Sequence, residues 1–438
     1  MDLDTNQPHW AKNIYPYFVF FLASLFYIYE FCLRVMPSTM THQLMAHYDL
    51  TAQGLGLLAA LFYFAYTPMQ IPAGLLYDRF RPRVLLALGI MLCAVSNYMF
   101  GHASSVIVAS IARLMIGFTS SFAFIGALLV ASRWFPPNRF ATLAGLVQLL
   151  GCLGAIIGEA PIAALVVHYG WLTSINILSG VGVALSLLVY GFIRTHPDHK
   201  KYPDAPKKDE LSIKQSLKRI THQGQTWWIA GYAFCCWAPI SIFATLWGPS
   251  AIHAEYHNSM TSASALTSII WVAIGLGSPL TGWLSNYFSN RKIPLVICSL
   301  LGLTGFMSIL FLHTPPYPIL IILLFIFGLS ATSQVITFGL VLDNQKDDVL
   351  GTAIGFNNMA VICGGVLLQP LVGFILTRIW RSHPVYAAHQ VPLYSFHEYQ
   401  MALLIIPACF IVGLLIALFA IKETHTKRVG AGNVTVMH

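Results

Sequence analysis

YFVFFLASLFYIYEFCLRVMP, residues 17–37, is an apolar run long enough to cross a bilayer, yet it contains Glu30 and Arg34. An ionisable side chain at the centre of a membrane helix costs several kcal/mol, so such a helix turns its charges toward protein or a wet cavity. Residues four apart lie on one helical face and can neutralise each other. We expect this face to line a pathway through the membrane; the alternative is an internal ion pair that only fixes helix packing.

The composition is that of an integral membrane protein. Of 438 residues, 57% are hydrophobic and 9% are charged, whereas soluble domains carry about 25% charged residues. Long apolar segments, rather than alternating ten-residue ones, indicate helices and not a β-barrel. The eight cysteines lie in apolar segments without CxxC spacing, which favours buried small side chains over metal ligands. The net charge of +8 does not indicate a nucleic-acid partner, because the position of the charges explains it better.

Segments of about 20 apolar residues predict twelve membrane-spanning helices. Lys and Arg fall mostly on one side of these helices, and only Arg378 and Arg381 fall on the other. The positive-inside rule then places both termini in the cytoplasm. The predicted helices are 17–37, 55–77, 84–101, 105–130, 141–167, 171–193, 227–248, 262–286, 293–313, 316–342, 351–377 and 399–421.

One long polar segment divides the chain. Residues 194–226 form a basic cytoplasmic linker, and their second part, near 209–220, has helical spacing suited to the basic membrane face. We therefore predict an N-terminal six-helix bundle in 1–193, a C-terminal six-helix bundle in 227–421 and a cytoplasmic tail in 422–438.

The two halves share a loop pattern. Gly74, Asp78 and Arg83 follow the second helix, and Gly282, Asn286 and Arg291 follow the eighth at the same spacing. Parallel repeats of this kind place a substrate site near the midplane, between the halves.

The loop after the second helix resembles the G-x-L-x-D-R-x-G-R-K motif of the major facilitator superfamily. Arg81 and Pro82 replace the motif's second glycine and a basic residue, and Arg113 with Gly117 resembles the family's R-x-x-x-G motif. The resemblance covers essentially the whole chain. It implies an all-α integral membrane fold of twelve transmembrane helices in two pseudo-symmetric six-helix bundles, in a monomer of the bacterial inner membrane. The matching loop residues are Gly74, Leu76, Asp78, Arg79 and Arg83.

The shared loop is expected to act as a cytoplasmic gate. Gly74 allows two helices to approach closely, and Asp78 can accept hydrogen bonds from helix N-terminal amides or from arginines, as a latch. A solvated turn is the alternative. The predicted gate residues are Gly74, Asp78, Arg79, Arg83, Asn286 and Arg291.

Four charges lie inside the predicted helices: Glu30, Arg34, Arg113 and Glu159. At 1.5 Å per residue, three of them lie roughly 10–12 Å below the outer surface, and Arg34 lies nearer to it. Glu30 is the predicted proton-coupling acid, because desolvation favours its protonated form while the guanidinium groups of Arg34 and Arg113 oppose it. Glu159 either takes part in proton coupling or forms a structural pair with Arg113.

The resemblance implies that helices 17–37, 105–130, 227–248 and 316–342 surround the cavity, with a contribution from 351–377. Tyr63, Tyr66 and Gln70 of the second helix add further candidates. The predicted substrate-binding residues are Tyr27, Glu30, Arg34, Arg113, Ser120, Trp237, Ser241, Gln334, Thr337, Asn357 and Asn358.

These features predict a secondary active transporter. The favoured interpretation is a proton-coupled importer of a small polar solute. For an amino acid, Arg34 or Arg113 would take the carboxylate and Glu30 the ammonium; a nucleoside or an organic acid fits almost as well. The Tyr29–Ser38 stretch resembles nutrient carriers of intracellular bacteria.

The alternative is proton-driven efflux of lipophilic compounds or siderophores. It loses support because the Gly-Pro antiporter motif of the family is not reproduced between Gly145 and Pro161. Neither a nucleotide-binding loop nor a Ser/His/Asp spacing is present, which argues against an ATP-driven pump or an enzyme. The expected partners are the substrate, the proton and the lipid bilayer, with no metal and no cofactor beyond the proton gradient.

Overall fold

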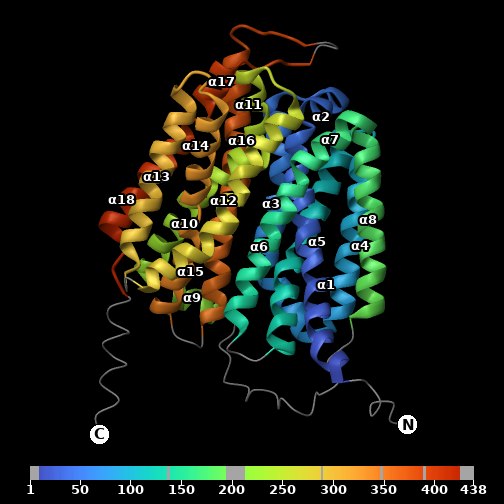
Figure 1. The fold of residues 1–438 in the computed structure, drawn as a ribbon, viewed down its shortest axis with the longest axis vertical. Coiled ribbons are helices and arrows are strands. Elements are labelled where there is room, and N and C mark those ends of the chain that lie inside the picture. Colours follow the sequence, from blue (N-terminus) through green and yellow to red (C-terminus); the bar gives the residue numbers. More distant parts are fainter. Residues whose placement is uncertain are drawn as a thin grey trace.

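The computed structural model describes residues 9–135, 139–193, 213–287, 290–345, 349–387 and 391–424. Long helices run along the longest axis of the molecule (Figure 1). Both the first and the last described residues lie at the bottom of that view, which we call the lower end; the opposite end is the upper end.

Eleven helices in the described residues are long and apolar enough to cross a membrane, or up to twelve if the bent pair Thr41–Tyr48 and Ala52–Gln70 is one span. The all-α membrane fold predicted from the sequence is therefore confirmed. The first half contains α1 (His9–Val35), α2 (Thr41–Tyr48), α3 (Ala52–Arg79), α4 (Pro82–Gly101), α5 (Val106–Trp134), α6 (Phe140–Gly158), α7 (Ala160–Tyr169) and α8 (Trp171–Phe192).

The second half follows a short helix, α9 (Ile213–Thr221), in the described part of the predicted linker; residues 194–212 lie outside the described residues, as do 425–438 of the predicted tail. Its helices are α10 (Gly224–Ile242), α11 (Gly248–Tyr256), α12 (Met260–Tyr287), α13 (Lys292–Phe311), α14 (Tyr317–Ser330), α15 (Ser333–Asn344), α16 (Leu350–Trp380), α17 (Phe396–Ala402) and α18 (Ile405–Leu415).

Several predicted spans are divided or extended, among them 316–342, which consists of α14 and α15. Two of these departures have clear local reasons. The seventh span continues to Tyr256 rather than ending near 248, because the π-helical segment η3 (Phe243–Trp247) joins α10 to α11. The fifth span is broken at Glu159, between α6 and α7. Pro161 has no N–H to donate, and the Glu159 amide reaches back only three residues, to the Ile156 carbonyl (3.3 Å).

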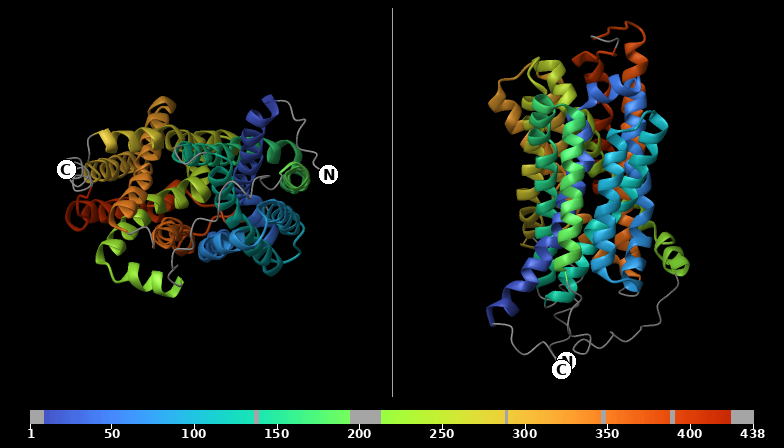
Figure 2. Two further views of the ribbon diagram at one scale, coloured as in Figure 1. Left: turned by 90° about the horizontal axis from the view of Figure 1, so that it is seen from below. Right: turned by 90° about the vertical axis from the view of Figure 1, so that its right-hand side faces the viewer.

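The halves lie side by side. Seen from below, α1–α8 group on one side of the molecule and α9–α18 on the other (Figure 2). They meet mainly where α3 packs on α16 and where α12 packs on α6 and α7. Three hydrogen bonds near the upper end join the halves: Thr41 to Ser250 (2.9 Å), the Ala52 amide to the Tyr394 hydroxyl (2.9 Å), and the Gln53 amide to the Thr377 hydroxyl (3.0 Å).

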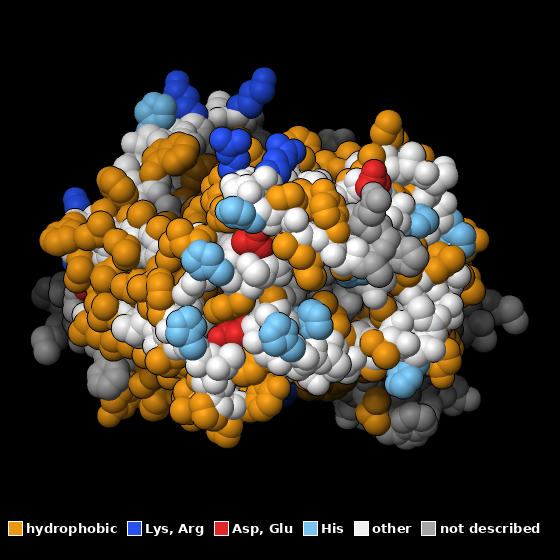
Figure 3. Space-filling view, turned by 90° about the horizontal axis from the view of Figure 1, so that it is seen from above, with side chains coloured by type: hydrophobic (Ala, Val, Ile, Leu, Met, Phe, Trp, Pro, Cys, Tyr) orange, Lys and Arg blue, Asp and Glu red, His pale blue; other side chains and the backbone are white. Residues whose placement is uncertain are grey.

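Surface charge differs between the two ends. Seen from above, histidine side chains and a few acidic ones are spread over the face, and several Lys or Arg side chains lie along one edge (Figure 3). More arginines and lysines mark the lower ends of α3, α4, α5 and α13, in Arg81, Arg83, Arg133, Arg291 and Lys292. A basic face of this kind is the one expected on the cytoplasmic side.

Candidate substrate and proton site

Glu30 and Arg34 form an ion pair on one face of α1. Glu30 is fully buried and Arg34 is 5% exposed. The Arg34 guanidinium also lies over the rings of Phe31 (4.2 Å to the centroid) and Tyr66 (4.8 Å), an arrangement in which the ring faces attract the cation. Among the described residues, Glu30 Oε2 and Arg34 Nε have no hydrogen-bond partner, so the pair retains capacity for a ligand. The predicted pairing is correct.

Arg113 of α5 lies near Arg34, since both guanidinium groups approach the Phe62 ring, but it has no carboxylate partner in the described part of the chain. It donates to the Leu33 carbonyl (3.3 Å), and its guanidinium lies 5.3 Å from the Phe62 ring centroid. The close approach of α3 depends on Gly117, because a Cβ there would collide with the Phe62 backbone. The R-x-x-x-G pair thus positions a buried guanidinium behind Arg34.

A narrow cavity of about 50 Å³, partly open to solvent, lies between the halves beside Arg34. Five predicted residues line it, namely Tyr27, Arg34, Trp237, Gln334 and Asn358, together with Tyr66 of the second span.

Six predicted binding residues do not line this cavity. Glu30 is paired with Arg34, which lines the cavity, and the Arg113 guanidinium lies over the Phe62 ring. Ser120 faces Cys93 of α4 (3.7 Å), so the prediction that it contacts substrate is not supported by this arrangement. The remaining three belong to hydrogen-bonded contacts inside the second half: Asn357 donates to Thr337 (3.0 Å), and Gln369 donates to the Ser241 carbonyl (2.6 Å).

Sequence reasoning missed six cavity residues: Phe31, Phe124, Gln148, Phe338, Val361 and Ile362. Most of them follow a named candidate by one helical turn on the same face, as Phe31 follows Tyr27 and Phe338 follows Gln334. Gln148 is a polar side chain within the apolar segment of α6. Its polarity at that depth was the available signal.

Glu159 does not form the structural pair with Arg113 that was one of its two predicted roles. Its Oε1 accepts from Trp271 Nε1 (2.9 Å), and its Oε2 lies 2.9 Å from the Ser268 hydroxyl; both partners belong to α12 of the second half. Glu159 and Arg113 do lie at a similar depth, as predicted, because Gly158 packs on the Cys32 backbone and Arg113 contacts Leu33. Helix α6, however, packs on α12 as well as on α1 and α5, and the carboxyl group of Glu159 contacts α12.

The predicted cytoplasmic gate lies at the lower end. The side chains of Asp78, Arg79 and Asn286 lie outside the described residues. Gly74 does not support a close helix contact in this arrangement, because a Cβ there would meet nothing within 4 Å. The predicted close contact is not made at Gly74 in this structure, and the gate role of these residues stays a prediction. Arg83 lies over the Tyr190 ring (4.3 Å to the centroid), within its own half.

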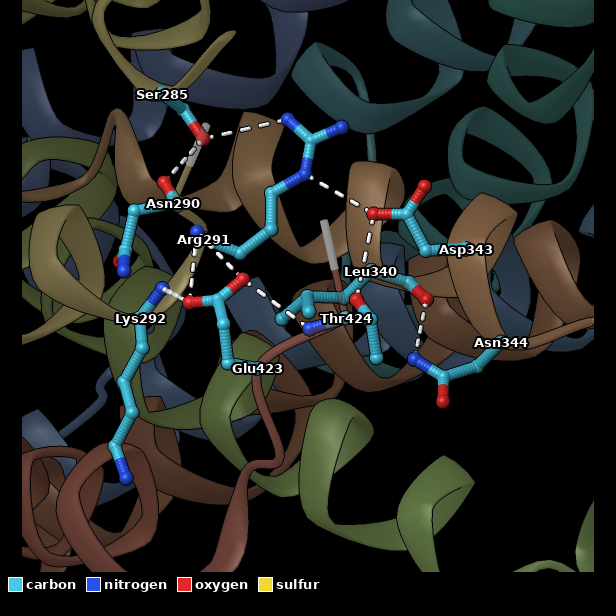
Figure 4. A network of polar contacts seen from close by, with 9 residues as sticks. All are labelled: Ser285, Asn290, Arg291, Lys292, Leu340, Asp343, Asn344, Glu423 and Thr424. Atoms are coloured by element: carbon cyan, nitrogen blue, oxygen red, sulfur yellow. Dashed lines mark hydrogen bonds and ion pairs between the residues drawn. The ribbon is translucent and has the colours of Figure 1, made fainter. Parts of the chain in front are cut away.

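Arg291 belongs to a polar network at the lower end of the second half (Figure 4). Its Nε donates to Asp343 at the end of α15 (3.1 Å), and its side chain reaches Ser285 (3.3 Å). Glu423 accepts from the amides of Arg291 (3.0 Å) and Lys292 (2.9 Å), where the first turn of α13 has unpaired N–H groups. Arg291 therefore joins α13, α15 and the C-terminal segment of one half.

Comparisons with known proteins agree with this architecture. The family model of the Major Facilitator Superfamily matches residues 19–370 and, in a second match, 233–435. A probable sulfoacetate transporter of Cupriavidus necator is 23% identical over 373 residues, which are 81% of this chain and 86% of that protein. A hexuronate transporter of Bacillus subtilis is 22% identical over 344 residues, 75% and 80% of the two chains.

Among solved structures, a bacterial homologue of the human lysosomal transporter Spinster, inward-facing and unoccupied, superposes with a TM-score of 0.77. It is 14% identical, and the match covers 93% of this chain and 97% of that one. The match of the family model to most of the chain shows the family, and the solved structure shows the same fold. The protein belongs to the major facilitator superfamily, and it is a secondary membrane transporter rather than an enzyme.

Proposed function

We propose that the protein imports a small organic anion, coupled to protons, by alternating access of a central site. The observation that carries this proposal is the charge beside the cavity: two buried guanidinium groups, of Arg34 and Arg113, lie at the Phe62 ring, and the one carboxylate there, Glu30, is paired with Arg34. Glu159, which would balance the second guanidinium, has partners of its own on α12. A buried site with one excess positive charge favours an anionic ligand.

Arg34 is the group that would bind the anion. It lines the cavity and has an unpaired Nε, and a guanidinium binds a carboxylate through two parallel hydrogen bonds. The cavity also presents the carboxamides of Gln148, Gln334 and Asn358, which suit hydroxyl or carbonyl groups on the rest of the ligand. Sulfoacetate and hexuronate, in the names of two relatives, are anions with a carboxylate and further polar groups.

Proton coupling follows from competition for Arg34. A substrate carboxylate that binds Arg34 displaces Glu30, and a buried carboxylate without its cation is costly unless it takes up a proton. Binding of the anion and protonation of Glu30 would therefore favour each other, as symport requires.

The orientation is proposed from charge and contacts. The basic lower end is assigned to the cytoplasm. The halves are joined by hydrogen bonds near the upper end, whereas Gly74 at the lower end faces open space. This arrangement corresponds to an inward-facing carrier, the state named for the structural relative.

The test is substrate binding and uptake with purified protein. We expect small carboxylates to raise the unfolding temperature and to enter proteoliposomes, whereas nucleosides and lipophilic cations do neither. Arg34→Gln should weaken binding of the anion roughly 30-fold or more, because the substrate carboxylate is then buried without its guanidinium partner (about 2 kcal/mol or more). Arg133→Gln, which removes an exposed lower-end arginine of α5 outside the cavity, should leave binding unchanged.

Glu30→Gln separates coupling from binding. The variant should still exchange labelled for unlabelled anion across the membrane, but a pH gradient should no longer drive accumulation. Accumulation equal to that of the wild type would remove Glu30 from the coupling role, and stabilisation by lipophilic cations alone would overturn the importer.

A further inference from the structure

Glu159 connects the two halves of the transporter. It is completely buried at the junction of α6 and α7, and both of its hydrogen-bond partners, Ser268 and Trp271, are carried by α12 of the opposite half. The close packing of Gly154 and Gly158 on the backbone of α1 fixes its position. Any separation of the upper ends must pull Glu159 away from these two partners.

The hydrogen atoms in this contact can be counted. The Trp271 indole can only donate, so Oε1 of Glu159 is the acceptor. The Ser268 hydroxyl lies 2.9 Å from Oε2 and also 2.9 Å from the Ser264 carbonyl oxygen, which can only accept. A hydroxyl has one hydrogen. When Ser268 donates it to the Ser264 carbonyl, Oε2 must itself carry a hydrogen and donate to Ser268 Oγ.

The surroundings of Glu159 favour the neutral acid. A fully buried carboxylate needs a cation or several strong donors. The elements packed against the junction are α1, α5, α7, α8, α12 and the short helix η1 (Met36–Thr39). On α1, Arg34 is paired with Glu30. On α5, the Arg113 guanidinium donates to the Leu33 carbonyl, and the described residues show no ion pair between it and Glu159. Of the other four elements, only α7 holds a residue that can become a cation near neutral pH, the exposed His168.

We propose that Glu159 is a proton latch: it is protonated while the upper end is closed, and it gives that proton to water on the upper side when the halves separate. In the closed state the neutral acid completes the chain Trp271–Glu159–Ser268–Ser264. In the open state the carboxyl group meets water and ionises. Acidic solution on the upper side then favours closure. The proposal rests on the alternating access proposed above, but not on the choice of substrate.

The first test measures opening of the upper end without substrate. Thr41 is buried at the upper contact, with its hydroxyl 2.9 Å from that of Ser250, so a cysteine in a Thr41→Cys variant reacts with a membrane-impermeant maleimide only when the end opens. Glu159→Gln imitates the protonated acid, because its carbonyl can accept from Trp271 while its NH₂ donates to Ser268. Dividing labelling rates by those of this variant removes the pH dependence of the maleimide reaction.

We expect the ratio to rise by up to about tenfold per pH unit, since opening releases one proton. Glu159→Gln should stay closed at every pH. Glu255→Gln removes an upper-end carboxyl group that accepts from the Thr314 amide within the second half, and it should keep the response of the wild type. An unchanging ratio would overturn the proposal. These outcomes are independent of whether any organic anion binds.

A second test observes the proton directly. The infrared difference spectrum of wild type minus Glu159→Gln, recorded where labelling shows a closed upper end, should contain the carbonyl stretch of a protonated carboxylic acid. Carboxylate bands in its place would show that Glu159 is ionised in the closed state, and the latch would be excluded.

Discussion

Glycines on the facing helices α3 and α16 lie in opposite environments at the two ends of the molecule. At the upper end, a Cβ on Gly56 would lie 2.7 Å from a backbone oxygen of α16, and one on Gly373 would collide with the backbone of α3. At the lower end, a Cβ on Gly74 or on Gly351 would meet nothing within 4 Å.

The difference shows which contacts the present state uses. Small residues let helix backbones approach closely inside a membrane. The upper glycines are needed for the contact that exists, whereas the lower glycines would permit a similar contact that is not made. A carrier that alternates between closure at either end needs glycines at both, and only one set is in use at a time.

The largest effect is expected from breaking the upper contact. The double variant Gly56→Ala, Gly373→Ala places two methyl groups where backbone atoms lie, and overpacking costs about 1–3 kcal/mol per site, or about 2 kcal/mol or more in total. We expect the ratio of open to closed upper ends to rise by roughly 30-fold or more, measured as labelling of Thr41→Cys.

The matched variant Gly74→Ala, Gly351→Ala makes the same chemical change at the lower end. It should not raise labelling, because the added methyl groups meet open space in the upper-closed state. Equal labelling of the two double variants would show that the upper glycines are not what holds the halves together.

Much of this molecule was predictable from local sequence. The ion pair of Glu30 and Arg34 is fixed by a spacing of four on one helix, so it needed no tertiary information. The membrane spans followed from the length of the apolar segments. The end of the seventh span was predicted too early, because a π-helical segment continues the helix beyond Gly248.

Tertiary partners were harder to predict. A pair of Glu159 with Arg113 was one of two alternatives drawn from formal charge and depth, but the packing of α6 on α12 gives Glu159 the partners Ser268 and Trp271 instead. Gly74 matches a family motif, yet its helix contact depends on which end of the carrier is closed. Sequence patterns do not specify which of two conformations a structure displays.

A smaller effect compares two glycines of one helix. Gly154 of α6 packs directly on the Ile28 backbone of α1, whereas Gly145, near the lower end, has open space. Gly154→Ala should lower the free energy of unfolding by about 1–3 kcal/mol through overpacking. Gly145→Ala should raise it by about 0.5–1 kcal/mol, because alanine loses less conformational freedom in a helix.

Denaturant unfolding followed by circular dichroism measures both variants on the same helix. A loss of stability in Gly145→Ala as large as that in Gly154→Ala would mean that the lower part of α6 is also packed against another helix.

The smallest effect is expected on α3 and α16 between the packed upper glycines and the open lower glycines. Asn358 of α16 donates to Gln70 of α3 (3.2 Å), below the glycine contacts, and it lines the cavity. Asn358→Ala should favour upper-end opening by about 0.5–1.5 kcal/mol, the net contribution of one hydrogen bond.

A double-mutant cycle with Gln70→Ala, read by labelling of Thr41→Cys, isolates this contact. If the hydrogen bond joins the halves, the double variant opens little more than either single variant, because each removes the same interaction. Additive effects would mean that the two side chains act separately, and the region of contact would then end above Asn358, at the level where Gly365 packs on the Tyr63 ring.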